Sequence, residues 1–204
     1  MITDFQPIAH TSPQRIIERE IGHLQPLLRS LRGSLALYTF RSAEAPALMR
    51  EVARLREQAF RLAGTGTGRA LDMDEGDVAH DGYRQIVAWD ERLRRVVGGY
   101  RYMVGNECNM DLLSTHHYFH FSPEFRCCYL PDAIELGRSF SVRATASALF
   151  VMGALWRGLG RIMLQQDAKY LFGKVTIPPH YDRQALRLLL LFLRKFFLAS
   201  PPKL

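Results

Sequence analysis

The chain has 204 residues, of which 48% are hydrophobic and 23% are charged; these values are ordinary for a globular domain and exclude a disordered or collagen-like chain. The length suits one domain with a sizeable core. A formal net charge of +7 excludes an acidic solvating protein and favours an anionic partner, such as a nucleic acid, a phosphate-bearing cofactor, an acidic carrier protein or a membrane surface.

Two helical patterns and one strand are predicted in the N-terminal part. Residues 15–31 place apolar side chains at helical spacing, and Pro26 is expected to break or kink this helix. Residues 35–40 (LALYTF) predict a short strand. Residues 45–63 form a clear amphipathic pattern, and the glycine-rich residues 64–68 (GTGTG) are expected to end that helix.

Strands dominate the rest of the chain, and five are predicted, at residues 84–89, 96–103, 118–121, 133–142 and 170–177. The first two flank a polar turn and should form a β-hairpin. Helices are predicted at residues 147–165 and 182–198, with Asp182 as the N-cap of the second. Helices that alternate with strands indicate an α/β fold with a mixed sheet.

The last predicted helix has more apolar side chains than a simple surface helix needs: Leu186, Leu188, Leu189, Leu190, Leu191, Phe192, Phe196 and Phe197. Packing in the core is the plain interpretation. The alternative is that part of this helix lines an acyl tunnel or rests on a membrane.

Acidic side chains crowd residues 71–81 (LDMDEGDVAHD). They lack the twelve-residue pattern and the terminal Glu of a calcium loop. A solvated loop is the plain interpretation, and the alternative is the binding of an amine-bearing substrate by several carboxylates. The preceding GTGTG segment is not a dinucleotide fingerprint, because it follows a helix and not a strand.

His116, His117 and His120 lie near Cys127 and Cys128 and raise the question of a zinc site. The segment lacks a CxxC pair and has no Glu directly after its first His, so a polar loop with core cysteines is favoured over a metal site.

Several locations and partners are disfavoured. The first ten residues lack the basic region and apolar core of a signal peptide, and no apolar run reaches the roughly 18–20 residues of a membrane span. The three cysteines do not form a disulfide framework, so we expect a reducing, cytoplasmic environment. No helix-turn-helix or aromatic–basic sheet pattern is present, and we expect no nucleic-acid partner.

The predicted strand at residues 133–142 carries Glu135 and Arg138 on either side of Gly137. A bulge at the glycine would re-aim Arg138. A buried Glu flanked by Ile and Leu needs a partner, so Glu135 either forms a structural ion pair with Arg138 or acts as a general base. Arg101, central in the hairpin, similarly needs a carboxylate or an anionic ligand.

Several strings carry a resemblance to a known family: LREQAF (55–60), VVGGYR (96–101), STHHYFHFSPEF (114–125), YLPDAIELGRSF (129–140), LWRGLG (155–160) and YLFGKVTIPPHYDRQALRLLLLFLRKFF (170–197). Together they resemble the GNAT-fold N-acyltransferases called hemolysin-like, which include N-acyl amino acid synthases and the glycine-lipid and ornithine-lipid N-acyltransferases. Acyl-homoserine lactone synthases are more distant relatives. The resemblance covers about residues 45–198.

The resemblance implies a single GNAT-like α/β domain, a mixed twisted sheet flanked by helices, at residues 45–204, after an N-terminal extension at residues 1–44. The implied reaction moves a long-chain fatty acyl group from an acyl carrier protein thioester to the amine of an amino acid, with glycine preferred over ornithine. No cofactor is bound permanently. The donor is an acyl-phosphopantetheine, with acyl-CoA the less favoured source. The implied location is cytoplasmic, with peripheral contact to the inner membrane face.

The resemblance also implies roles for residues. Glu135 is the base, and Arg101 and Arg138 hold it or the acceptor carboxylate. The substrate-binding residues are Arg56, Phe60, Asp72, Asp74 and Asp77. The acyl donor should lie against the free strand edge, with its amides at Ser139, Phe140, Ser141 and Val142 and its phosphate near Arg143.

Two features depart from the family. Residues 141–150 (SVRATASALF) lack its Val-Gln-Pro-type continuation and the glycine-rich pyrophosphate loop of acetyl-CoA-using GNATs. The family also continues with further sheet elements after the last helix, so we expect a C-terminally short form. Two alternatives therefore stay open: a non-catalytic module that binds a carrier protein or a membrane, and a CoA-dependent small-acyl acetyltransferase.

Overall fold

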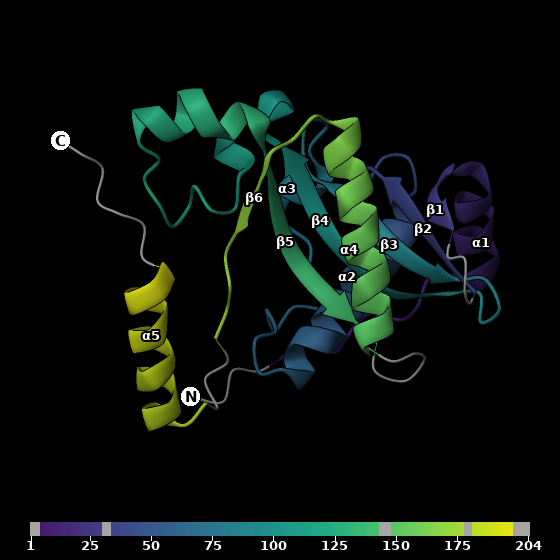
Figure 1. Ribbon diagram of the computed structural model, residues 1–204. Helices are drawn as coiled ribbons and strands as arrows, with labels where there is room; N and C mark the ends of the chain where they lie inside the picture. The colour runs from purple at the N-terminus through teal and green to yellow at the C-terminus, as the bar shows by residue number, and fades with distance from the viewer. Residues whose placement is uncertain (1–4, 30–33, 143–147, 178–180, 198–204) are drawn as a thin grey trace.

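The computed structural model describes residues 5–29, 34–142, 148–177 and 181–197. A twisted sheet carries helices on both faces (Figure 1). Its strands lie side by side in chain order: β1 (Pro26–Arg29), β2 (Leu35–Phe40), β3 (Arg84–Asp90), β4 (Arg95–Val104), β5 (Ala133–Ser141) and β6 (Tyr170–Gly173). Neighbouring strands are antiparallel except β5 and β6, which are parallel. The predicted mixed α/β sheet is confirmed.

The main helices are α1 (Gln14–His23), α2 (Pro46–Leu62), α3 (Glu75–Val78), α4 (Ala148–Gln165) and α5 (Arg183–Phe197). Buried side chains of α1 and α2 form one core cluster with one face of the sheet, and those of α4 form a second cluster with the other face. A third, smaller cluster lies beneath the loop segments between β4 and β5 and includes Tyr83 and Met103.

The sequence of β2 explains its central place. Leu35 and Leu37 belong to the cluster beneath α4, whereas Ala36 and Tyr38 belong to the cluster beneath α1 and α2. A strand that is buried on both faces has no polar alternation, and LALYTF has none. β1 and β2 come from residues 1–44, and both pair within the same sheet as the rest of the chain.

The end of α2 is held by the glycine-rich segment that follows it. Gly64 adopts φ +75°, the left-handed conformation that ends many helices. The buried Glu57 carboxylate accepts the N–H groups of Thr67 at 3.0 Å and Gly68 at 2.9 Å. These amides therefore close the loop on its own helix rather than facing a phosphate.

The predicted break of the first helix near Pro26 is confirmed, but the second half of that predicted helix is wrong. α1 ends at His23, and Pro26–Arg29 forms the edge strand β1, paired with β2. Proline lacks the N–H that a helix interior needs but is tolerated at the start of an edge strand. The spacing of the leucines around Pro26 therefore fits a strand as well as a helix.

Two predicted strands also differ. Residues 118–121 lie in a turn and an irregular segment, and β6 ends at Gly173 rather than continuing to residue 177. Gly173 approaches β5 so closely that a Cβ there would lie 2.4 Å from the Leu136 carbonyl oxygen. The hairpin of β3 and β4 is confirmed.

α5 begins as predicted, since Asp182 accepts the N–H groups of Gln184 at 2.9 Å and Ala185 at 3.0 Å. The expected core packing is wrong, because none of its described residues is buried. Figure 1 shows α5 standing apart from the sheet and from α4. None of the helices within the described ranges has the length and apolarity of a membrane span.

Candidate active site

The strand β5 contains a bulge at the position that its sequence indicates. Arg101 of β4 pairs with Gly137, whereas Gly99 pairs with Phe140, so β5 carries one residue more than β4 over this stretch. Arg138 adopts φ +53°, a left-handed conformation that non-glycine residues rarely take. The bulge turns the Arg138 side chain toward the acidic loop after α2, and strain of this kind is often found at functional sites.

Three arginines and three aspartates form a cluster beside this bulge. Arg101 donates to Asp74 at 2.7 Å and 2.8 Å and to Asp77 at 3.2 Å. Arg138 donates to Asp74 at 3.0 Å and also to Asp72. The sixth member, Arg56 of α2, binds Asp77 at 3.1 Å and 3.2 Å. The structure thus brings together six of the residues predicted to serve the site.

Burial and the arginines act in opposite directions on these carboxylates. Burial raises the pKa of Asp74, but Arg101 and Arg138 outweigh that effect and lower the pKa to about 2. For Asp72 burial outweighs Arg138, and the pKa is raised. Each aspartate of the cluster is paired with arginine, so the plain interpretation of a solvated loop is wrong for these three, whereas Glu75 and Asp81 of the same loop are exposed.

Glu135 lies apart from this cluster and is fully buried. Its carboxylate accepts the Ser114 hydroxyl at 2.9 Å, the Ser114 N–H at 3.2 Å, the Thr115 N–H at 2.8 Å and the Tyr83 hydroxyl. The expected ion pair between Glu135 and Arg138 is therefore wrong, because four neutral donors satisfy the acid while Arg138 binds aspartates. Arg101 also binds aspartates and not Glu135.

Tyr83 connects the two groups. Its hydroxyl contacts Glu135, and its ring lies under the Arg101 guanidinium, 4.0 Å from the centroid. Burial, and then the negative charge of Glu135, raise the pKa of Tyr83 well above its ordinary value. The phenol therefore stays protonated and donates to Glu135. Tyr83, Ser114 and Thr115 were missed by the sequence analysis, although Ser114 and Thr115 open the STHHYFHF string.

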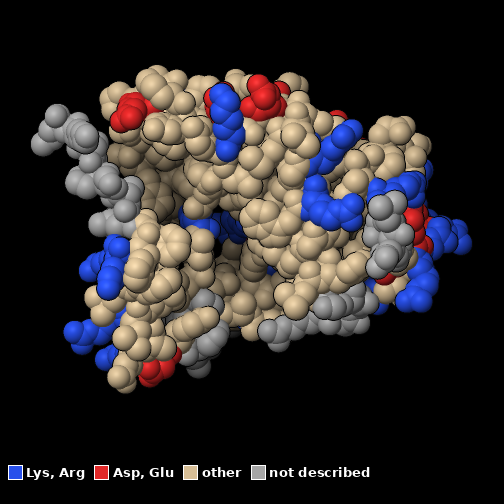
Figure 2. Space-filling model, viewed as in Figure 1, with Lys and Arg blue, Asp and Glu red and all other residues tan. Residues whose placement is uncertain are grey.

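The strands β5 and β6 separate next to the bulge. β6 pairs with β5 only from Ala133 to Leu136, and within the described residues no strand lies beside 137–141 on that side. Figure 1 shows the chain after β6 diverging from β5, and Figure 2 shows a hollow between α5 and the sheet with basic side chains inside it. This is the free strand edge that the sequence analysis expects for an acyl donor.

The residues expected along this edge differ in exposure. Ser139 is exposed, Ser141 is half-buried and Phe140 is buried in the core beneath α2. The Val142 N–H donates to the Val97 carbonyl at 2.9 Å, on the β4 side. Arg143 lies outside the described residues.

Lys174 follows β6 at this opening and was not singled out from the sequence. Its Nζ donates to the Ser114 carbonyl at 3.1 Å and lies 4.1 Å from the centroid of the Tyr118 ring. Burial, and then the nearby Arg101, lower the pKa of Lys174. The lysine thereby ties the end of β6 to the segment that binds Glu135.

Phe60 and the residues considered for a metal site are the remaining candidates. Phe60 is half-buried and packs against the core cluster beneath α2, as Leu71 and Met73 also do. Among the described residues no His, Cys, Asp and Glu side chains form a group that could hold a metal ion. Cys127 and Cys128 are exposed, in contrast to the core cysteines expected, and their sulfur atoms lie 2.9 Å apart.

The sheet that opens beside a bulged strand, with helices on both faces, matches a known family of domains. The model of the acetyltransferase (GNAT) domain family matches residues 55–157, half of the chain, and the chain belongs to that family. The acyl-homoserine lactone synthase LasI has a similar fold, with a TM-score of 0.50 and 16% identity over 79% of this chain and 78% of LasI.

Two curated relatives are more specific. The chain is 40% identical over 196 residues to the glycine N(alpha)-acyltransferase of Phocaeicola vulgatus and 39% identical over 196 residues to that of Bacteroides thetaiotaomicron. Each match covers 90% of this chain but only 60% and 58% of the relatives. The chain thus spans a little over half the length of these enzymes, and the predicted resemblance to N-acyltransferases that act on glycine is confirmed at the level of sequence.

Proposed function

We propose that this chain transfers a long-chain acyl group from an acyl carrier protein thioester to the α-amine of glycine. Relatives that bear the name glycine N(alpha)-acyltransferase support the acceptor. The observation that carries the proposal is the juxtaposition of the bulged strand β5, the buried Glu135 and the divergence of β6 from β5. An acceptor, a base and a thioester meet at this place.

The donor site follows from the free edge of β5. Backbone groups there that face away from β4 would hydrogen-bond the pantetheine amides as an added strand does. Backbone N–H groups of the bulge would stabilise the oxyanion formed when the thioester is attacked. Ser139 and Ser141 lie along this edge, and the net charge of +7 favours an acidic carrier protein.

The chemical step needs one proton acceptor. Glycine reacts as the free amine, after its ammonium form has lost one proton to solvent. The amine nitrogen bonds to the thioester carbonyl carbon, the carbon–sulfur bond breaks, and the sulfur leaves as a thiolate on its carrier. The nitrogen gives up a second proton, which the acceptor takes and then returns to the thiolate, so that the carrier leaves as the free thiol. Glu135 has no exposed surface, so it does not meet the amine directly. Ser114 donates its hydroxyl hydrogen to Glu135 at 2.9 Å, and this hydroxyl can pass a proton from the amine to the acid.

The acceptor amino acid would bind to two buried atoms of the arginine–aspartate cluster that lack hydrogen-bond partners in the described part of the chain. The buried Asp72 Oδ2 and Arg101 Nε atoms have no hydrogen-bond partner among the described residues. An ammonium group on Asp72 and a carboxylate on Arg101 or Arg138 would hold a small amino acid by both ends. With this chemistry, the chain would act in the cytoplasm, in lipid synthesis associated with a membrane.

Mass spectrometry of reaction mixtures tests the proposal. The purified chain is incubated with glycine and palmitoyl-carrier protein, palmitoyl-CoA or acetyl-CoA. We expect N-palmitoylglycine, formed faster from the carrier protein. N-acetylglycine alone would favour the small-acyl acetyltransferase, and no product from any donor would favour the non-catalytic module.

Variants of Glu135 and Ser114 test the two steps of the proposed proton path separately. Glu135→Gln should lower turnover about 100-fold or more, and Ser114→Ala about tenfold, with urea midpoints that show both variants folded. The control is Glu107→Gln, since Glu107 is exposed and forms an ion pair with Arg84 at 3.1 Å. Normal turnover by the Glu135 variant would remove this residue from the proton path.

A further inference from the structure

The helix α5 exposes an unusual amount of apolar surface. No described residue of α5 is buried. Its exposed large apolar side chains are Leu188, Leu190, Leu191, Phe192, Leu193, Phe196 and Phe197. Single exposed leucines are common, but a contiguous surface of this kind marks an interaction site.

These side chains fall into regular stripes along the helix. Positions spaced by four, three and four residues lie on one side of a helix. One such stripe is Ala185, Leu189, Phe192 and Phe196, and its neighbour is Leu186, Leu190, Leu193 and Phe197. Two adjacent stripes are therefore wholly apolar over the full length of the helix.

A basic stripe runs beside them. Arg183, Arg187 and Arg194 follow the same helical spacing, Lys195 lies nearby, and residues 183–197 contain no Asp or Glu. Figure 2 shows tan atoms over most of α5, with blue side chains along its outer edge. The helix thus combines positive charge with an apolar face and carries no negative charge of its own.

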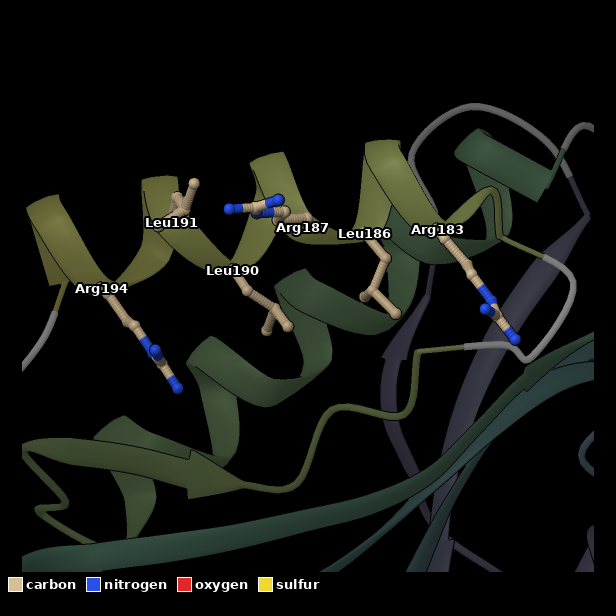
Figure 3. Close-up of a pocket in the computed structure, with 6 residues that line it drawn as sticks. All are labelled: Arg183, Leu186, Arg187, Leu190, Leu191 and Arg194. Carbon is tan, nitrogen blue, oxygen red and sulfur yellow. The ribbon is translucent and has the colours of Figure 1, made fainter.

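An open groove of about 440 Å³ lies along the boundary between the two kinds of surface. Its lining residues are Arg183, Leu186, Arg187, Leu190, Leu191 and Arg194. In Figure 3, Leu186 and Leu190 point to the same side as Arg183 and Arg194, which lie beyond them at either end. An apolar strip with a guanidinium at each end matches an acyl chain next to an anionic headgroup.

We infer that α5 docks on an anionic phospholipid bilayer, lying in the plane of the interface with its leucines and phenylalanines among the acyl chains. A helix with a wide apolar face, a basic edge and no acidic residue has the composition of an interfacial helix. Long arginine side chains reach from such a face to the headgroups. This inference does not rest on acyl transfer and concerns where the protein resides.

Vesicle flotation with the full chain tests the inference. One vesicle population contains phosphatidylcholine alone, and the other contains phosphatidylcholine with phosphatidylglycerol. We expect binding to the anionic vesicles that salt weakens. The double substitution Leu190→Ser and Phe197→Ser should weaken this binding at least tenfold, and Arg187→Gln with Arg194→Gln should weaken it about thirtyfold.

Helix α4 offers matched controls. Leu149 and Leu164 are exposed, and their change to Ser together should leave vesicle binding unchanged, as should the change of the exposed Arg157 and Arg161 to Gln. The inference is overturned if the unchanged chain does not bind anionic vesicles, or if the α4 control substitutions weaken binding as much as the α5 substitutions do. It is also overturned if sedimentation shows self-association that the α5 substitutions abolish without any vesicle binding.

Glycine acylation is measured separately, without vesicles and with a carrier-bound donor. Loss of vesicle binding with normal acylation in solution would contradict the docking role alone. Absence of acylation with normal vesicle binding would contradict the proposed function alone.

Discussion

Arg56 and Glu135 have no solvent-exposed surface, whereas no described residue of α5 is buried. Both regions look unusual in the sequence, one as charges within buried elements and the other as an apolar run at the end of the chain. In the first region, each charged side chain finds a partner within the described residues. In the second, the leucines and phenylalanines remain uncovered.

The difference follows from the physics of the two kinds of group. A buried charge is tolerated only with a hydrogen-bonded partner of suitable geometry, so the fold must supply one. Apolar burial is non-directional, so an apolar face accepts any apolar surface, including a lipid bilayer. The buried polar residues therefore need partners that the fold itself supplies. The apolar face of α5 needs no particular partner within the fold and is free to bind another apolar surface.

Among the substitutions that test this comparison, Arg56→Ala is expected to lower the free energy of unfolding the most. The side chain is fully buried between Asp77 and Gln85, and its loss leaves Asp77 with one cation fewer. Breaking a buried ion pair from one side costs about 3–5 kcal/mol, which urea denaturation would measure. Arg50→Ala, on the same helix but exposed, should cost less than about 0.5 kcal/mol. Equal costs would show that the cluster adds nothing to stability.

The sequence predicted the members of the polar region better than their pairing. Arg101, Arg138 and Glu135 stand in strand positions where a charge needs a partner, and this requirement alone marks them. The partners could not be predicted, because Glu135 is satisfied by Tyr83 and by the segment at 114–115, which come from distant parts of the chain. Almost every residue has a backbone N–H group, so residue types do not indicate which of these groups will donate a hydrogen bond to Glu135.

The same contrast applies to the secondary structure. Patterns predicted α2 because its apolar side chains recur at helical spacing, and the β3–β4 hairpin because two apolar runs flank a polar turn. They failed where one pattern fits two structures, as at Pro26–Arg29, and where the outcome depends on tertiary contacts. The apolar spacing of α5 predicted a helix correctly and its packing wrongly, because spacing does not say what covers the face.

A second prediction concerns the pH dependence of the polar region. The folded pKa of Asp74 is lowered to about 2, below its ordinary 3.8, so its stabilising effect is present above the ordinary value and is lost as pH falls toward 2. Asp74→Asn should therefore lower stability at pH 7 by about 1 kcal/mol, a value reduced by solvent screening at a side chain that is 36% exposed.

Urea midpoints at pH 7 and pH 2.5 check this sign. The difference between the unchanged chain and Asp74→Asn should shrink at the lower pH, while the difference for the exposed Asp81→Asn should stay constant and small. A gap that widens in acid would mean that the arginines do not hold Asp74 in its charged form.

The smallest effect is expected in α5, where the same substitution can be compared with one in the core. Leu188 is 62% exposed, whereas Leu48 on α2 is fully buried. Leu48→Ala should lower the free energy of unfolding by about 2–5 kcal/mol, since it leaves a cavity. Leu188→Ala should change it by less than about 0.5 kcal/mol in vesicle-free buffer. If Leu188→Ala lowers the free energy of unfolding by more than about 1 kcal/mol, the apolar face of α5 is already covered in solution. That result would contradict the proposal that this face binds a bilayer.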